Sequence, residues 1–260
     1  HRKAGFHAAF ITDHNLISGA EEAKENHRNL IQIPHLDVQM RDLVKGAGIV
    51  PLSGEELSLN ECHLAVLGNR ALIANSLYDG SVGGIQKFLS VMKSSDALVI
   101  ASLPEYWKYH WDRREDFVRW GIHGFEIVNS APLALDFPPS RMSEMIEFCN
   151  QHDLVMTGIT DTHGWGSTVY AWNVACLPGW RSLGARELEN ALLAHLRDKK
   201  SQANEIYVRI KADPSEKKAL LAFDPFLQIW QGARTLPFSH ALSCLAWIFG
   251  AAFLLRKKRG

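Results

Sequence analysis

The stretch FEIVNSAPLALDFPPSRMSEMIEFCNQHDLVMTGI, residues 125–159, decides the fold class of this chain. Its two ends are apolar and predict short strands over Phe125–Val128 and Leu154–Ile159. Between them, Ser140–His152 has the length and the spacing of apolar residues that are typical of a helix. A strand, a helix and a second strand in succession form the repeating unit of parallel α/β folds, so an α/β fold is expected.

The same alternation of strands and helices continues on both sides of this stretch. Further strands are expected over residues 6–12, 49–52, 62–67, 97–101, 169–176 and 206–210. Helices are expected from residue 18 onward and over residues 36–45, 85–93, 112–120 and 185–199, with a glycine-rich loop at 79–84. From residue 212 to residue 235 the pattern is weak, and this segment is interpreted as a connector.

The composition is typical of a globular protein. With 260 residues, of which 47% are hydrophobic, the chain can bury the core of a full domain. The 28 basic residues balance the 28 acidic residues, so no nucleic-acid partner is expected. The four cysteines show no paired spacing and predict neither a disulfide framework nor a zinc site built from thiolates. Cys62 and Cys176 lie in apolar stretches and are expected to be buried.

An apolar run near the C-terminus, Phe238–Leu255, is followed by the four cations Arg256–Arg259. A helix of about 18 residues spans about 27 Å, close to the thickness of the hydrocarbon core of a bilayer. The sequence therefore predicts a transmembrane helix over residues 236–255 and a basic tail over 256–260. Because positive residues mark the cytoplasmic side, we expect a single-pass membrane protein with a cytoplasmic C-terminus and the preceding domain outside the cytoplasm. A buried C-terminal helix and a cleaved sorting tail are the alternatives.

Five residues that can bind metal ions lie at or near the ends of predicted strands. They are His14 in the segment Ile11–Asn15, Glu56 in Gly54–Glu56, His63 in His63–Gly68, and Asp161 with His163 in Gly158–Gly164. Strand ends converge in a barrel-like α/β fold, so side chains that are far apart in the sequence can meet there. Imidazole nitrogens and carboxylate oxygens together bind divalent ions such as zinc, iron and manganese. The sequence therefore predicts a metal site.

The order of these motifs resembles that of the PHP family, the polymerase and histidinol phosphatase superfamily of metal-dependent phosphoesterases. Ile11–Asn15 resembles the Thr-Asp-His strand end of that family, and Gly54–Glu56 resembles its Gly-x-Glu motif. His63–Gly68 is similar to the histidine-containing strand that follows, and Gly158–Gly164 to the closing Gly-Ser-Asp-x-His motif. Gly124–Asn129 is similar to the strand before that motif, and the resemblance covers roughly residues 5–175.

Two features of the chain depart from the pattern of the family. The opening His-x-His strand is absent and Arg2–Gly5 resembles the end of a helix, so we expect a fragment without its first strand and helix. Leu103 stands where the family has a histidine before proline, which puts one metal position in doubt. His110 is a candidate replacement, although a surface histidine is the favoured interpretation. Without the upstream ligands, this chain is expected to be inactive by itself.

The resemblance implies a role for each candidate ligand. Glu56 would bridge two metal ions, Asp161 would complete the first site and His63 would contribute to the second. The third ion would be held by His14 and His163. If the register shifts by one residue, Glu55 would take the place of Glu56.

Other residues are expected to support these ligands or to contact the substrate. Asp13 and Asn15 would orient the ligands from behind, as Glu55 would if it is not itself a ligand. Asn129 would contact the substrate or hold the end of its strand. Arg113 and Arg114 would pair with phosphate, or pack in an aromatic patch with Trp107, Tyr109, Trp111 and Trp120.

The resemblance thus implies a distorted (β/α)7 barrel over residues 1–178 that lacks its first strand and helix. Residues 179–235 would follow as a helix, a strand and the connector, before the membrane helix. Two or three divalent ions (manganese, zinc or iron) would activate a water molecule that hydrolyses a small phosphorylated substrate. The alternatives are a metallohydrolase for other esters or amides, and a membrane-tethered binding domain whose active site has decayed.

Overall fold

The computed structural model describes residues 6–18, 20–22, 24, 49–59, 61–134, 136–161, 171–208 and 246–247. Contacts divide the chain into two units. The first comprises residues 1–161 and 169–209 and contains every strand named below. The second comprises residues 162–168 and 210–260, in which the described residues are Ala246 and Trp247, both helical.

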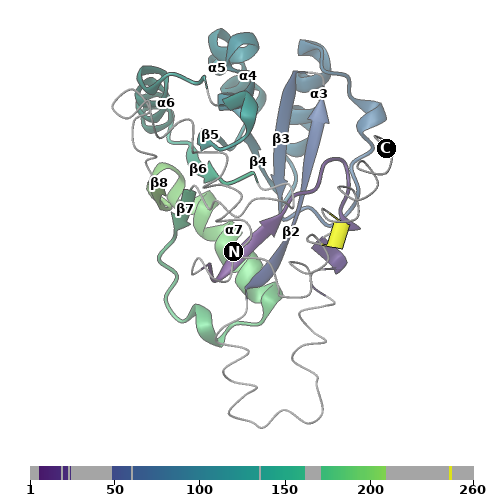
Figure 1. Ribbon diagram of the computed structural model, residues 1–260, viewed down its shortest axis with the longest axis vertical. Coiled ribbons are helices and arrows are strands. Elements are labelled where there is room, and N and C mark those ends of the chain that lie inside the picture. The colour runs from purple at the N-terminus through teal and green to yellow at the C-terminus, as the bar shows by residue number, and fades with distance from the viewer. Residues whose placement is uncertain are drawn as a thin grey trace, which may run out of the picture. The chain divides into compact units, whose positions relative to one another are not determined.

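A six-stranded mixed sheet forms the centre of the first unit (Figure 1). In spatial order its strands are β1 (Ala8–Ile11), β2 (Val50–Leu59), β3 (Cys62–Leu67), β4 (Leu98–Ala101), β5 (Gly124–Asn129) and β6 (Val155–Ile159). The pairs β1–β2, β4–β5 and β5–β6 are parallel, whereas β3 is antiparallel to both of its neighbours. A separate antiparallel pair joins β7 (Ala171–Val174) to β8 (Glu205–Val208).

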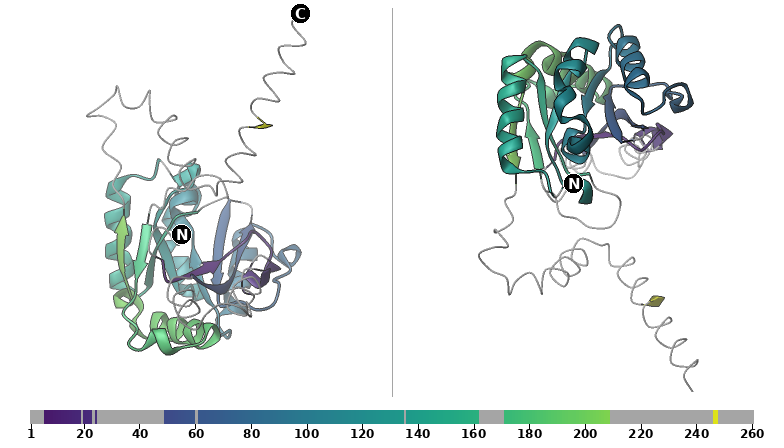
Figure 2. Two further views of the ribbon diagram at one scale, coloured as in Figure 1. Left: turned by 60° about the horizontal axis from the view of Figure 1, so that its bottom comes forward. Right: turned by 90° about the horizontal axis from the view of Figure 1, so that it is seen from above.

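The sheet is covered on both faces by helices (Figure 2). One face packs against α3 (Val82–Met92), α5 (Arg114–Trp120) and α6 (Pro139–Gln151). Alternate residues of the strands, such as Val66 and Phe125, point into this core. The opposite face packs against α7 (Ala185–Lys199), where Leu193 and Leu196 join Ala65 and Ile100 in a second apolar cluster. The strands β3 and β4 contribute residues to both cores and are therefore packed on both faces.

The α/β class predicted from the sequence is confirmed, but the predicted (β/α)7 barrel is wrong. Within the described residues the strands form an open, curled mixed sheet with β1 and β6 at its two edges. The link between β2 and β3 consists of residues 60–61, which is too short for a crossover helix, so β3 pairs with β2 as an antiparallel hairpin instead of a parallel barrel strand. β2 also runs through Glu55 and Glu56 to Leu59, where the sequence analysis predicted a strand end at residue 52.

None of the helices in the described ranges combines the length and the apolar composition that crossing a bilayer requires. This finding overturns the predicted transmembrane helix over residues 236–255 and the predicted single-pass location. Within that segment the structure describes Ala246 and Trp247, and its other residues lie outside the described ranges.

Three smaller expectations can be compared with the structure. Cys62 is buried as predicted, but Cys176 is exposed, because it follows β7 in a coil segment outside both apolar cores. The helix predicted over residues 36–45 lies outside the described residues. Beyond the predicted boundary at residue 178, α7 and β8 belong by contact to the same unit as the six-stranded sheet.

Replacing Gly124 with alanine is expected to destabilise the fold, because the new Cβ would lie 2.2 Å from the carbonyl oxygen of Val155 on the paired strand. The free energy of unfolding, measured with urea, should fall by about 1–3 kcal/mol, the usual cost of overpacking. Gly83→Ala is the control, since the nearest atom to its Cβ beyond the adjacent residues and the helix backbone would be the Ser81 Oγ at 3.8 Å. Alanine in the first turn of α3 should be neutral or stabilise by up to about 1 kcal/mol. An unchanged urea midpoint for Gly124→Ala would contradict the close β5–β6 packing.

Candidate metal centre

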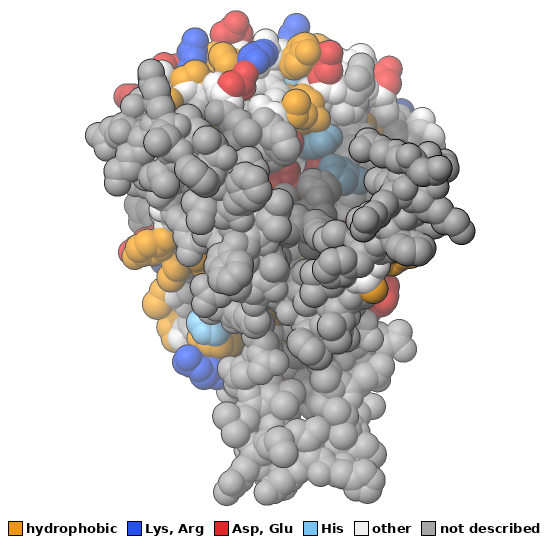
Figure 3. Space-filling model, in the orientation of Figure 1, with side chains coloured by type: hydrophobic (Ala, Val, Ile, Leu, Met, Phe, Trp, Pro, Cys, Tyr) orange, Lys and Arg blue, Asp and Glu red, His pale blue; other side chains and the backbone are white. Residues whose placement is uncertain are grey.

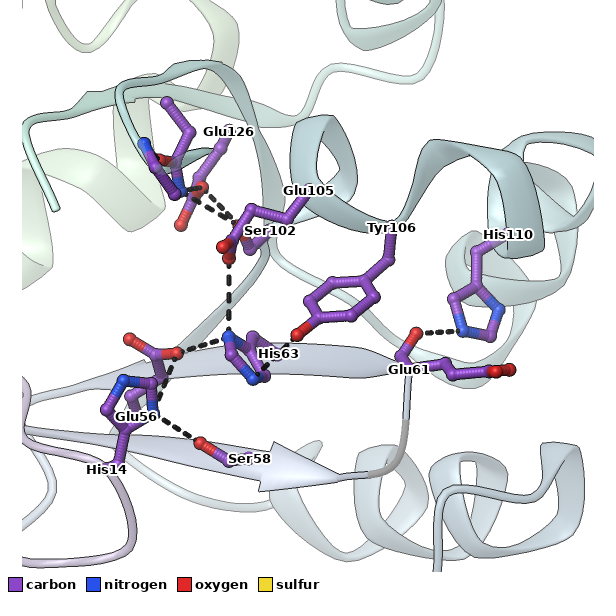
Figure 4. Close-up of polar contacts among 12 residues, drawn as sticks. His14, Glu56, Ser58, Glu61, His63, Ser102, Glu105, Tyr106, His110 and Glu126 are labelled. Atoms are coloured by element: carbon purple, nitrogen blue, oxygen red, sulfur yellow. Dashed lines mark hydrogen bonds and ion pairs between the residues drawn. The ribbon is translucent and has the colours of Figure 1, made fainter. Parts of the chain in front are cut away.

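Three of the predicted metal ligands meet on one face of the sheet where β1, β2 and β3 adjoin. His14 follows β1 and forms an isolated parallel bridge with Glu56 of β2. His63, at the start of β3, pairs with Ser58, two residues beyond Glu56 in β2. Because side chains alternate between the faces of a strand, this register places Glu56 and His63 on the same face. Figure 4 shows His14 and His63 on either side of the Glu56 carboxylate.

The side-chain geometry of these three residues suits a metal ion. One carboxylate oxygen, Oε1 of Glu56, lies 2.6 Å from Nδ1 of His63 and 3.3 Å from Nδ1 of His14. One ligand atom from each residue can be chosen so that all three lie within 4.8 Å of one another. Small side-chain rotations would bring them to the usual bonding distance of about 2.0–2.2 Å from one ion. Two imidazoles and a carboxylate form the donor set that zinc, iron and manganese accept.

The centre is accessible to solvent. The His14 side chain is 41% exposed, and the side chains of Glu56 and His63 are each 16% exposed. In Figure 3, histidine and acidic side chains are visible together in a recess of the surface. A small molecule in solution could therefore reach an ion held by these residues.

Backbone hydrogen bonds around His14 fix its position against β2. The amide of Glu56 donates to the carbonyl of Asp13 (3.1 Å), and the amide of Asn15 donates to the carbonyl of Glu56 (2.8 Å). The Asn15 side chain accepts a hydrogen bond from the amide of Ser58 at 3.0 Å, with Asn15 at a φ of 52°. Asp13 and Asn15 thus hold the chain on both sides of His14.

Gly54 lets β1 and β2 approach closely just before the centre. A Cβ at this position would lie 2.6 Å from Cγ2 of Thr12 and 3.1 Å from the carbonyl oxygen of Ile11. The side chain of Thr12 therefore occupies the space above residue 54. This packing brings the segment that carries His14 next to the segment that carries Glu56.

The helix α4 (Leu103–His110), which the sequence analysis did not predict, contributes two more polar side chains. Oε2 of Glu105 lies 3.3 Å from Nδ1 of His63, and the hydroxyl of Tyr106 lies 2.9 Å from Nε2 of the same ring. Ser102 precedes the helix and Glu105 follows three residues later, a spacing that marks helix starts and could have indicated α4. The aromatic residues of this segment and its early Pro104 leave no clear helical spacing of apolar residues in the sequence.

A buried hydrogen-bonded cluster lies behind Glu105. The hydroxyl of Ser102 is 2.9 Å from Oε2 of Glu105 and 2.6 Å from Oε2 of Glu126, and Asn129 donates to Glu126 at 2.9 Å. A hydroxyl donates only one hydrogen bond, so one of the two carboxyl groups must carry a proton. Burial, reinforced by the charges of Glu56 and Glu105, raises the pKa of Glu126 to about 8, which identifies Glu126 as the protonated acid.

The imidazole of His63 has the opposite electrostatic environment. Burial disfavours its charged form, but the hydrogen bonds and charges of Glu105 and Glu56 outweigh this effect and raise the pKa of His63 to about 9. Burial likewise opposes ionisation of Glu105, yet its contacts with His63 and Ser102 lower the pKa of this carboxyl group. Without a bound cation, His63 is therefore the positive charge that balances the acids around it.

Among the described residues, neither Asp161 nor Glu55 belongs to the cluster of His14, Glu56 and His63. Asp161 follows β6 with a φ of 40°, and its charge is one of the causes, after burial and nearer acids, that raise the pKa of Tyr106 to about 12. His163 lies outside the described residues. Glu55 points to the opposite face of β2, where its carboxylate accepts hydrogen bonds from Asn69 (2.7 Å) and the amide of Ile73 (3.0 Å).

The residues considered for substrate contact lie in two different places. Asn129 is buried, and its side-chain oxygen Oδ1 accepts a hydrogen bond from the amide of Ala131 at 2.6 Å. Arg114 stacks 3.7 Å from the ring centroid of Trp111, and Arg113 lies 3.9 Å from the carboxylate of Asp116. Both arginines therefore pack around α5 and the aromatic patch.

The first and last residues of α4, Leu103 and His110, are buried. Leu103 is 2% exposed and joins the apolar cluster beneath α3 and α5. His110 is 7% exposed, and its Nε2 lies 2.7 Å from the carbonyl oxygen of Glu61. The interpretation of His110 as a surface histidine is therefore wrong, because α4 turns this ring inward against Phe117.

Glu126→Gln is expected to change how stability depends on pH. The pKa of Glu126 is about 8 in the folded protein, whereas the ordinary pKa of a glutamate in the unfolded chain is 4.5. Between these values the folded state binds more protons, so this group makes stability fall as the pH rises. Glutamine does not titrate, and the variant should lose less stability than the wild type between pH 5 and pH 8.

Urea unfolding at several pH values measures this difference. The contributions of His63 and Glu105 are present in both proteins and largely cancel in the comparison. If both proteins lose the same free energy of unfolding over this range, Glu126 is not protonated in the folded state.

Comparison of the chain with protein-family models gives no match, and comparison with curated proteins gives no significant match. The resemblance to the PHP family therefore rests on the motifs around His14, Glu56, His63 and Asp161 and stays a prediction.

Proposed function

We propose that this protein is a metal-dependent hydrolase whose substrate is a small phosphate ester. The proposal rests chiefly on the convergence of His14, Glu56 and His63, which lie just after β1, within β2 and near the start of β3. Two imidazole nitrogens directed at the same carboxylate oxygen form a preorganised set of donors for a divalent cation. Manganese, zinc and iron are the ions that fit this set.

Different residues of the chain would bind the ion and admit the substrate at such a site. His14, Glu56 and His63 would hold the ion, which would supply activated water and stabilise the developing phosphoryl charge. Glu105 lies against the same nitrogen of His63 as Glu56 does, and it offers a further carboxylate at the edge of the site. The partial exposure of His14 leaves room for the substrate.

The electrostatics favour a site that depends on a cation. Glu56 and Glu105 are acidic, and none of the lysines and arginines in the described ranges pairs with either of them. An anionic phosphate ester would therefore be repelled unless bound metal supplied positive charge. The motif resemblance to a phosphoesterase family adds support for phosphate over carboxylic esters and amides.

A binding domain without hydrolytic activity is the second candidate. Leu103 favours it, because this side chain is buried in the apolar core and provides no ligand where the family has a histidine. Such a protein would bind metal without turning over phosphate esters. Hydrolysis assays on the metal-loaded full-length protein separate the two functions.

Glu56→Gln is expected to weaken Mn²⁺ binding, measured by calorimetry, by at least about tenfold to 100-fold, because loss of a ligand should cost at least as much as loss of its supporting contacts. Glu55→Gln is the matched control, since this neighbouring acid lies on the opposite face of β2 and should leave Mn²⁺ affinity nearly unchanged. Equal effects of the two substitutions would rule out the proposed centre.

The full-length protein should then release phosphate from a chromogenic phosphate monoester only when Mn²⁺, Zn²⁺ or Fe²⁺ is present. Carboxylic ester and amide substrates are assayed in parallel. Hydrolysis of these substrates alone would identify a different metallohydrolase, and metal binding without any hydrolysis would support the binding domain.

A further inference from the structure

Tyr106 lies beside His63 at the edge of the candidate metal centre. The α4 helix is kinked at this residue, where φ is −117° and ψ is 24°. Its ring meets the ring of His63 edge-on with centroids 4.8 Å apart, and its hydroxyl lies 2.9 Å from Nε2 of His63. Figure 4 shows the hydroxyl directed from α4 toward His63.

The two nitrogens of His63 face different surroundings. Nδ1 faces the carboxylates of Glu56 and Glu105, on the side where the ligand atoms converge. A neutral imidazole carries one proton, so an ion bound to Nδ1 leaves the proton on Nε2. In the metal-loaded protein, Nε2–H would therefore donate its hydrogen bond to the oxygen of Tyr106.

This arrangement leaves the hydroxyl hydrogen of Tyr106 available. The phenol oxygen accepts from His63, and its own proton must point elsewhere. Among the described residues, His63 is the sole hydrogen-bond partner of this hydroxyl. A hydroxyl that can donate a hydrogen bond is thus held one imidazole ring away from the atoms that would bind the ion.

We propose that Tyr106 is a catalytic residue whose hydroxyl donates a hydrogen bond to a phosphoryl oxygen of the metal-bound substrate. This inference rests on the proposed phosphoesterase function and adds a residue that none of the sequence motifs includes. It meets a need of the site, because no lysine or arginine in the described ranges pairs with Glu56 or Glu105. A neutral donor can approach phosphate without disturbing the acids that hold the ion.

The alternative role for Tyr106 is to orient the His63 ring by accepting its Nε2–H. The two roles predict different measurements. A residue that only orients a ligand affects metal affinity, since such supporting contacts act on the ligand. A residue that contacts the substrate affects the affinity for phosphate when the metal site is already saturated.

The test uses calorimetry on the full chain, first with Mn²⁺ and then with inorganic phosphate at saturating Mn²⁺. Tyr106→Phe is expected to weaken phosphate binding by about tenfold, as for one hydrogen bond to a charged acceptor, and to change the Mn²⁺ affinity by less than about threefold. Tyr109→Phe is the matched control, because this tyrosine lies on the same helix and is 56% exposed. It should change neither affinity.

Each other outcome has a definite meaning. If Tyr106→Phe weakens Mn²⁺ binding but leaves phosphate binding at saturating Mn²⁺ unchanged, Tyr106 only orients His63 and the proposal is overturned. If neither affinity changes, it is also overturned. If the wild-type protein binds Mn²⁺ but no phosphate, the proposed phosphoesterase function itself fails, and this result is recognisable before any variant is made.

Discussion

The register between β2 and β3 is the constraint on which the centre depends. Glu56 pairs with Ala65 and Ser58 with His63, so the acid and the imidazole emerge from the same face two positions apart. A shift of β2 by one residue would turn Glu56 to the opposite face of the sheet, away from His63, and bring Glu55 to its place. The apolar residues that alternate with these positions, Leu57 and Leu64, are fully buried on the other face and prevent such a shift.

The centre concentrates more acid than its surroundings can neutralise. Glu56, Glu105 and Glu126 lie along one line of contacts that passes through His63 and Ser102. The protein reduces the repulsion in two ways: it protonates His63 at the accessible end and keeps Glu126 neutral at the buried end. A divalent cation at the accessible end would take over the first of these roles.

Local sequence patterns identified most of the elements and three members of the centre. Periodicity predicted the segments that became β3, α6 and α7 almost residue for residue, because each has a clear apolar pattern. The motif comparison selected His14, Glu56 and His63 without knowledge of their contacts. The order of the motifs could not reveal that β3 runs antiparallel, since strand direction here depends on a two-residue link. It also could not reveal Glu105 and Tyr106, because α4 has a weak helical pattern and the contacts of both residues are tertiary.

The contact between Gly54 and Thr12 gives one part of the Gly-x-Glu motif a steric meaning. A Cβ at position 54 would clash with the threonine methyl group and crowd the carbonyl oxygen of Ile11. The glycine is thus required by the distance between two chain segments and takes no part in chemistry. A related protein that had lost hydrolytic activity would still need glycine at this position for the two segments to pack. The motif in a sequence therefore indicates this packing before it indicates an activity.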